Sequence, residues 1–188
     1  MEEKLKQIPT NCIKIVVFGP ESTGKTTLCK QLATHYKTNW VPEFSRQYAL
    51  DKLKEGKQLT QEDVLPIAVG QMQLENEIAE KTKKLLICDT NLVETLVYSQ
   101  TIYEGYSPKT LVKNIIQHRY HLYLLTNIDI PWEFDVVRDG NADRQKMFLH
   151  FEAILQKNKL PYIIVSGNPQ QRLQKAIEQI DRLLKTTK

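Results

Sequence analysis

The chain reads Gly19-Pro20-Glu21-Ser22-Thr23-Gly24-Lys25-Thr26 immediately after an apolar run at residues 13–18, and this stretch decides its fold. It matches the G-x-x-x-x-G-K-[ST] pattern of a phosphate-binding loop. Two glycines let the backbone wrap closely around a phosphate chain with its N–H groups turned inward, because glycine has no Cβ to obstruct the approach. An ordinary turn before a helix is the alternative. The apolar strand before the loop and the helix after it favour phosphate binding.

Most residues of the loop, together with Thr27, are predicted to bind ATP. Lys25 adds a positive charge for the β- and γ-phosphates and is expected to face solvent and phosphate, and Thr26 offers its hydroxyl to Mg²⁺. The helix that opens near Gly24 directs the positive end of its dipole at the same anion. The residues predicted to bind ATP are Gly19, Glu21, Ser22, Thr23, Gly24, Lys25, Thr26 and Thr27.

The composition, 41% apolar and 26% charged, is typical of one globular domain, here expected over residues 1–188. The 26 basic and 22 acidic residues leave a net charge of only +4, and the lysines are scattered, so we expect no nucleic-acid partner. Residues 1–12 form a polar lead-in, and no apolar run approaches the roughly 20 residues needed to cross a bilayer. Three widely spaced cysteines fit a reduced, cytoplasmic protein. The oligomeric state stays open, because every apolar stripe is also needed for the core.

Strands and helices are expected to alternate along the chain. Strands are predicted at 13–18, 40–41, 85–88, 120–125 and 162–165, and helices at 24–36, 43–56, 60–81, 91–101, 107–118, around 147–155 and at 168–184. Pro66 is expected to kink the third of these helices, and Ser107 to cap the fifth. This alternation predicts an α/β fold of the P-loop NTPase class, with a parallel five-stranded sheet, helices on both faces and a small lid.

Acidic residues are expected beyond the carboxyl ends of the strands, where ligands bind in such sheets. Asp89 follows four apolar residues, and a carboxylate there can hold Mg²⁺ or accept a proton from a substrate hydroxyl, although it could also cap the next helix. Glu43 and Arg46 lie one helical turn apart and face the same way. We expect this pair to bind substrate rather than to form a plain surface salt bridge, with Glu43 the rival of Asp89 as catalytic base.

The irregular segment at about 127–145 is predicted to form a lid. It carries Arg138 and Arg144, and arginines on a closing segment can neutralise the charge that develops during phosphoryl transfer while water is excluded. An ordinary loop with surface arginines is the alternative. Trp132 could stack on a flat ring or anchor the lid. The Asn127-Ile128-Asp129 segment is one residue short of the base-reading motif of GTPases and lacks its lysine, which argues against a GTPase.

Several segments together match one family: the loop at 19–26, Pro-Glu-Phe-Ser-Arg-Gln-Tyr at 42–48, Cys-Asp-Thr-Asn at 88–91, Tyr103 with Gly105, Leu-Leu-Thr-Asn at 124–127, and a lid with Trp132, Asp135, Arg138 and Arg144. On these segments the chain resembles the ribosylnicotinamide kinase domain at the C-terminal end of the bacterial NadR proteins. The resemblance implies substrate contacts for Glu43, Arg46, Asp89, Asn91, Tyr103, Trp132 and Asp135. It does not extend to the helix-turn-helix and nucleotidyltransferase domains of those proteins, so neither repressor nor adenylyltransferase activity is expected.

The sequence thus predicts a P-loop kinase that uses ATP and Mg²⁺, with Thr26 and Asp89 near the metal and Lys25, Asp89, Glu43, Arg138 and Arg144 in catalysis. The resemblance implies that its acceptor is nicotinamide riboside and its product nicotinamide mononucleotide. A kinase for another nucleoside or small metabolite is the alternative within enzymes, and a nucleotide-binding regulatory ATPase with little turnover is the alternative outside them. The choice between ATP and GTP stays open, because adenine is often bound by backbone and apolar contacts without a motif.

Overall fold

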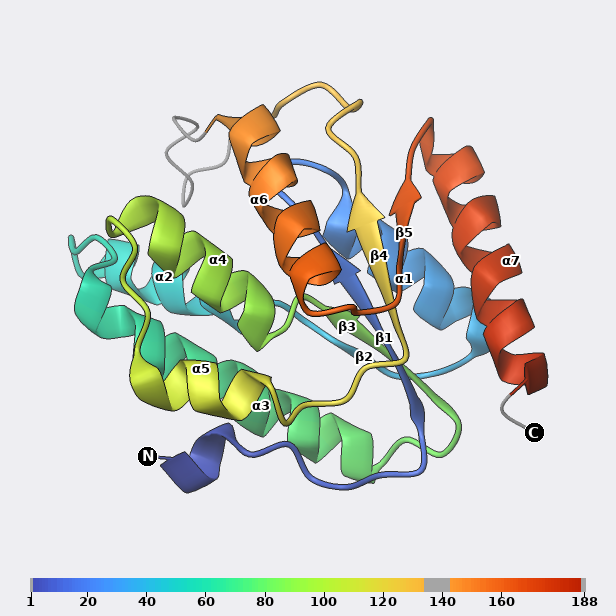
Figure 1. Ribbon diagram of the computed structural model, residues 1–188, viewed down its shortest axis with the longest axis horizontal. Coiled ribbons are helices and arrows are strands. Elements are labelled where there is room, and N and C mark those ends of the chain that lie inside the picture. Colours follow the sequence, from blue (N-terminus) through green and yellow to red (C-terminus); the bar gives the residue numbers. More distant parts are fainter. Residues whose placement is uncertain (1, 134–142, 187–188) are drawn as a thin grey trace.

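A computed structural model describes residues 2–133 and 143–186, and its centre is one five-stranded parallel sheet (Figure 1). The strands lie in the order β2 (Trp40–Val41), β3 (Leu85–Asp89), β1 (Ile13–Phe18), β4 (Leu122–Thr126) and β5 (Tyr162–Val165). All four pairings are parallel. The central strands β1, β3 and β4 are buried along their whole length, as continuous apolar runs favour. The predicted five-stranded parallel sheet is confirmed.

Helices cover both faces of the sheet, as predicted (Figure 1). On one face lie α1 (Lys25–Tyr36) and α7 (Pro169–Thr186). On the other lie α3 (Val64–Glu80), α4 (Leu92–Ile102) and α6 (Arg144–Lys157). Two helices, α2 (Phe44–Lys54) and α5 (Lys109–Ile115), and a 3-10 turn at Glu2–Leu5 pack against α3 and α4 rather than against the sheet. No helix in the described ranges is long and apolar enough to span a bilayer.

Aromatic side chains fill the space between the sheet and α6. The ring of Phe18 meets Phe151 edge-on with centroids 4.6 Å apart, and meets Tyr123 in the same way at 5.5 Å. All three are buried, and burying side chains of this size contributes roughly 1.5–3 kcal/mol each. Because Phe18 immediately precedes Gly19, this packing fixes the point at which the phosphate-binding loop leaves β1.

A buried charged pair explains the lysine inside β1. Lys14 Nζ lies 2.9 Å from Glu75 Oε1 on α3, and both side chains are almost fully buried. Gln7 Nε2 donates to the same oxygen at 2.9 Å, and Tyr120 OH donates to Glu75 Oε2 at 2.7 Å. Because each charged group is paired and hydrogen-bonded, the network is tolerated inside the protein, and it ties the N-terminal segment to α3.

Three local predictions differ from the structure. Residues Gln61–Asp63 form a 3-10 turn and α3 begins at Val64, so Pro66 lies in the first turn, where its missing N–H removes no helical bond. The reason for a kink therefore disappears, and Thr60 and Asp63 form a capping box at the start of the 3-10 turn. Ser107 Oγ donates to the carbonyl of Gly105 instead of capping α5, which is shorter than predicted. Strand β4 begins two residues later than predicted.

Candidate active site

The phosphate-binding loop lies between the carboxyl ends of β1 and β4. Gly19 has φ 138°, and a Cβ there would lie 2.7 Å from Thr126 Oγ1 and 3.0 Å from the Thr126 carbonyl oxygen. Only glycine fits this approach without strain. Thr23 Oγ1 donates to Pro20 O at 2.7 Å and lies 2.7 Å from Thr126 Oγ1, so hydroxyl contacts hold the loop in shape. Gly24, with φ 78°, is the N-cap residue of α1.

Lys25 is buried, contrary to the expectation that it faces solvent. Its Nζ donates to the carbonyl oxygens of Gly19 at 2.8 Å and Pro20 at 2.9 Å, and it lies 3.2 Å from Oε1 of Glu94 on α4. Both side chains are 4% exposed. The other oxygen of Glu94 accepts a long hydrogen bond, 3.4 Å, from the Gly19 N–H. Sequence reasoning did not select Glu94 as a site residue. Its one signal was a carboxylate among the apolar residues Leu92, Val93 and Leu96 at the start of α4.

Thr26 and Asp89 meet as a candidate magnesium site. Thr26 Oγ1 donates to Asp89 Oδ2 at 2.5 Å, and Asp89 is fully buried at the end of β3. Magnesium in phosphate-transfer sites is usually bound through one or two carboxylates together with waters and substrate phosphates. A hydroxyl and one carboxylate beside a phosphate-binding loop therefore fit this ion. Within the described part of the chain, no group of three or more His, Cys, Asp or Glu side chains could hold a metal by itself.

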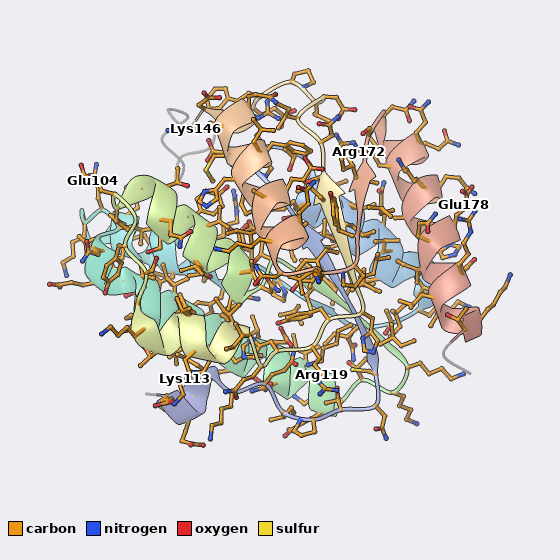
Figure 2. The ribbon with its side chains drawn as sticks, viewed as in Figure 1. Glu104, Lys113, Arg119, Lys146, Arg172 and Glu178 are labelled. Carbon is orange, nitrogen blue, oxygen red and sulfur yellow. The ribbon has the colours of Figure 1, made fainter. Side chains whose placement is uncertain are left out.

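Arg172 lies in the first turn of α7 (Figure 2). It joins three segments around the loop, and sequence reasoning missed it. Its Nε donates to Gly167 O at 2.8 Å, its Nη1 to Thr23 O at 2.7 Å and its Nη2 to Asn127 O at 2.9 Å. Nη2 also forms an ion pair with Asp129. The side chain is only 3% exposed. The phosphate-binding loop, the end of β4 and the start of α7 are thus held together by one guanidinium.

Both carboxylate oxygens of Asp129 take part in this arrangement. Burial alone would raise the pKa of its carboxyl, but the Gly167 N–H and the Arg172 guanidinium outweigh burial and hold the pKa below its usual value. The Gly167 N–H donates to Oδ2 at 2.6 Å, and Arg172 pairs with Oδ1. Both oxygens therefore accept from groups of the protein, and Asp129 helps to hold the start of α7 against the end of β4.

A cavity of about 270 Å³ lies beside the loop and is a candidate nucleotide pocket. Its walls come from the loop and α1, from the first residues of the lid segment and from the start of α7, and they include Gly24, Thr27, Gln31, Ile130, Pro131 and Arg172. The mixture of apolar groups and a few polar ones is typical of a pocket for a flat ring.

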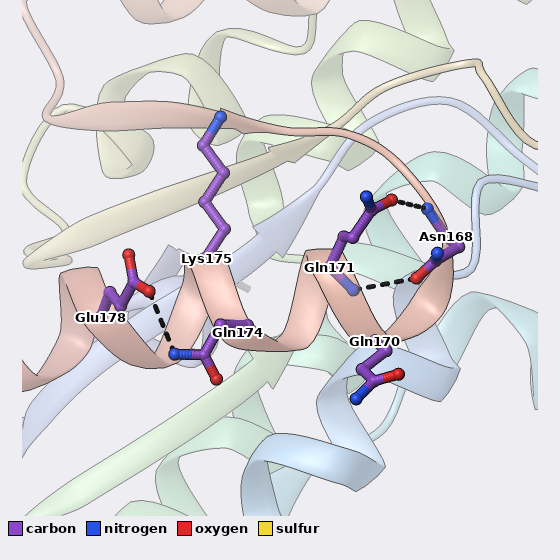
Figure 3. A pocket seen from close by; sticks show the side chains of 6 residues that line it. All are labelled: Asn168, Gln170, Gln171, Gln174, Lys175 and Glu178. Carbon is purple, nitrogen blue, oxygen red and sulfur yellow. Dashed lines mark hydrogen bonds between the residues drawn. The ribbon is translucent and has the colours of Figure 1, made fainter.

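A larger hollow of about 420 Å³ lies on the outer side of α7 (Figure 3). Amide and charged side chains line it, among them Asn168 and Gln171, which cap α7 by donating a backbone N–H to each other's side-chain oxygen at 2.9 and 3.0 Å. None of the predicted site residues borders this hollow. The smaller cavity beside the loop is therefore the better candidate for a nucleotide pocket.

The two described ends of the predicted lid meet at the phosphate-binding loop. The Glu133 N–H donates to Ser22 Oγ at 2.8 Å. Arg144 Nη2 donates to the carbonyl oxygens of Ser22 and Ile130, each at 3.1 Å, so this predicted catalytic arginine does lie against the loop. Trp132 is 42% exposed next to the cavity wall. The predicted roles of Asp135 and Arg138 fall on residues outside the described ranges.

Glu43 and Arg46 open α2, beyond the carboxyl end of β2. Glu43 is half-buried at the N-cap position, and its Oε1 accepts a hydrogen bond from Ser45 Oγ at 2.7 Å. The first helical N–H, that of Phe44, donates at 2.8 Å to Oε1 of Gln71 on α3, which fixes the direction in which α2 starts. Arg46 is exposed. The predicted pair therefore lies at the same edge of the sheet as the loop, on the side of α3.

Asn91 and Tyr103 occupy the two ends of α4. Asn91 is 1% exposed, and it caps the helix by accepting from the Val93 N–H at 3.1 Å and donates to Tyr123 OH at 3.1 Å. Tyr103 packs in the apolar cluster between α3 and α4, and burial, followed by the carboxylate of Asp63, raises the pKa of its hydroxyl. The structure thus gives both residues structural contacts, and the substrate contacts that the resemblance implies for them stay predictions.

Comparison with known protein families matches residues 14–172 to a model described as an AAA domain. The trifunctional NAD biosynthesis/regulator proteins NadR of Salmonella typhimurium and of Escherichia coli are each 27% identical to the chain over 154 residues. That match covers 80% of this chain and 37% of each relative. The chain therefore spans little more than a third of the length of these relatives.

Solved structures share the P-loop α/β fold. A NadR protein in complex with NR superimposes with a TM-score of 0.73 at 20% identity, over 92% of this chain and 50% of that one. A NadR protein in complex with NAD and AMP-PNP gives 0.70 at 19% identity, over 92% and 49%. Thymidylate kinase from Ehrlichia chaffeensis gives 0.65 at 14% identity, over 92% of this chain and all of that one. At these identities the likeness shows the fold and no more.

Proposed function

This chain belongs to the AAA-domain family, and on that premise we propose that it is a kinase that transfers the γ-phosphoryl group of ATP to the 5′-hydroxyl of nicotinamide riboside. One observation carries the proposal. The phosphate-binding loop brings Lys25 and Thr26 close to acidic side chains, and Thr26 contacts Asp89. The loop passes so close to Thr126 that position 19 must be glycine. Relatedness to the NadR proteins over 80% of the chain supports the choice of acceptor.

The loop supplies what phosphoryl transfer asks of a protein, which is positioning and charge stabilisation. Backbone N–H groups of the loop and of the first turn of α1 bind the phosphates, and Lys25 lies close enough to move onto them. Thr26 and Asp89 would hold Mg²⁺, which when bound neutralises charge on the phosphate oxygens. Arg144, at the root of the lid, adds a positive charge beside the loop.

The contacts of Asp129 favour ATP over GTP as the phosphate donor. A GTPase reads guanine with a carboxylate that accepts from the base, and both oxygens of Asp129 are already bonded to Gly167 and Arg172. The cavity beside the loop has apolar walls at Leu28, Ile130 and Pro131, and Asp129 is not among the residues that line it. The NadR complex with AMP-PNP, an ATP analogue, agrees with this assignment for the relative.

The two candidate acids, Asp89 and Glu43, have different surroundings and suit different roles. Asp89 is committed to the hydroxyl of Thr26, which suits the metal-proximal role. Glu43 is half-buried at the start of α2 and suits the general base that accepts the proton of the 5′-hydroxyl. Trp132, Asp135 and Arg46 would bind the nicotinamide riboside, whose pyridinium ring gains from an aromatic face and a nearby carboxylate.

An acceptor panel tests the proposal. ADP release is measured with ATP and Mg²⁺ in the presence of nicotinamide riboside, uridine, cytidine, adenosine or no acceptor, with Lys25→Met as the inactive control. We expect nicotinamide riboside to stimulate ADP release most strongly. Stimulation by another nucleoside alone would move the enzyme to that substrate class. Release that no acceptor stimulates would favour a regulatory nucleotide-binding protein.

A further inference from the structure

The protein itself engages the ammonium group of Lys25 in this structure. The ammonium donates to Gly19 O and Pro20 O and lies 3.2 Å from Glu94 Oε1 as an ion pair. A phosphate that binds Lys25 competes with these contacts. The two carbonyls belong to the loop itself, whereas Glu94 reaches in from α4 and carries a full negative charge.

Glu94 touches the loop with both carboxylate oxygens. Oε1 lies 3.2 Å from the Lys25 ammonium, and Oε2 lies 3.4 Å from the Gly19 N–H. An ammonium group and a backbone N–H are the two kinds of donor that such a loop offers to a phosphate. The carboxylate is 4% exposed, and burying a charge is tolerated only when it is paired; Lys25 supplies such a pairing.

We infer that Glu94 is a positioning residue that holds Lys25 in the nucleotide-free protein and gives it up to the phosphates when nucleotide binds. The inference rests on the proposed phosphate site and goes beyond it, because it states that Glu94 lowers the affinity of the protein for ATP. In the free protein Glu94 keeps the lysine ordered beside the loop. In the complex its negative charge lies within a few ångströms of the phosphate chain and repels it, so the resting pair lowers nucleotide affinity.

Replacement by a neutral residue of the same shape separates this role from a merely structural one. We expect Glu94→Gln to bind ATP about ten-fold more tightly than the wild type, since one close like-charge contact is removed and Lys25 no longer has to leave an anion. A merely structural residue would give equal or weaker binding when altered. Glu94→Asp keeps the charge but shortens the side chain, and we expect it to bind ATP with an affinity between the two.

The measurement is isothermal titration of ATP into each protein without any acceptor. Glu77→Gln is the matched control, because it makes the same charge change on α3 at an exposed glutamate paired with Lys81. Its affinity should equal that of the wild type. Unchanged or weaker ATP binding by folded Glu94→Gln would overturn the inference. If that variant does not fold, Glu94→Asp takes its place, and an ATP affinity no higher than that of the wild type would overturn the inference. The proposed acceptor can fail independently, because no acceptor is present in this titration.

Discussion

Arg172→Met should destabilise the protein and weaken ATP binding together. The change keeps an apolar stem but leaves the carbonyls of Thr23, Asn127 and Gly167 without the guanidinium donors and the carboxylate of Asp129 without its cation. Removing one partner of a buried pair costs about 3–5 kcal/mol, and we expect about 3 kcal/mol because the Asp129 side chain is 33% exposed. At about 2–4 °C per kcal/mol for a chain of this size, the midpoint of thermal unfolding should fall by about 6–12 °C.

The same variant should raise the KM for ATP, because Arg172 both supports the loop at Thr23 and borders the nucleotide cavity. Arg182→Met is the matched control, since Arg182 is exposed on the same helix. Arg172→Lys should recover part of the stability, because it restores the charge opposite Asp129 but not the planar fork that reaches several acceptors. Differential scanning fluorimetry and ATP titrations measure both effects. A midpoint for Arg172→Met within about 2 °C of the Arg182→Met control would refute this reasoning.

Three further variants probe separate parts of the protein. Gly19→Ala should abolish ATP binding in a nucleotide titration, because its Cβ would lie 2.7 Å from Thr126 Oγ1 at a φ that other residues rarely adopt, and normal binding would contradict the described loop. Asp63→Asn should reduce the loss of stability in acid. Burial alone would raise the pKa of Asp63, but hydrogen bonds from Lys52 and other donors lower it to about 2. The ionised carboxylate therefore stabilises the fold fully above pH 3.8, and this stabilisation is lost as the pH falls towards 2. Urea unfolding across this pH range should show the wild type losing more stability than the variant. Trp132→Ala should raise the KM for nicotinamide riboside by roughly three- to thirty-fold in ADP-release assays, with a smaller effect on neutral nucleosides, and equal effects would exclude a stacking role.

The parallel sheet and the phosphate-binding loop could be predicted from the sequence because their signals are local. The run at 13–18 and the glycines at 19 and 24 fix a strand and a turn within a few residues. The meeting of Thr26 with Asp89 could also be anticipated, since parallel strands bring their carboxyl ends to one edge of the sheet.

The partners of Lys25 and of the loop could not be predicted, because they come from distant elements. Arg172 lies four residues before Ala176 and eight before Ile180, on the buried stripe of α7, and that placement was its only signal. A charged residue at the end of a helix usually lies on the surface, and only the packing of α7 against the loop gives this one its acceptors. Glu94 likewise lies in the first turn of a helix that Asn91 caps, and nothing in that local pattern points to its contact with Lys25.

The origin of the phosphate in the product tests the central claim most directly. The protein is incubated with nicotinamide riboside, Mg²⁺ and ATP that carries heavy oxygen in its γ-phosphoryl group, and the products are separated and weighed by mass spectrometry. The proposed function predicts nicotinamide mononucleotide that carries the label, formed in equal amount to ADP. Labelled inorganic phosphate with no labelled mononucleotide would contradict it.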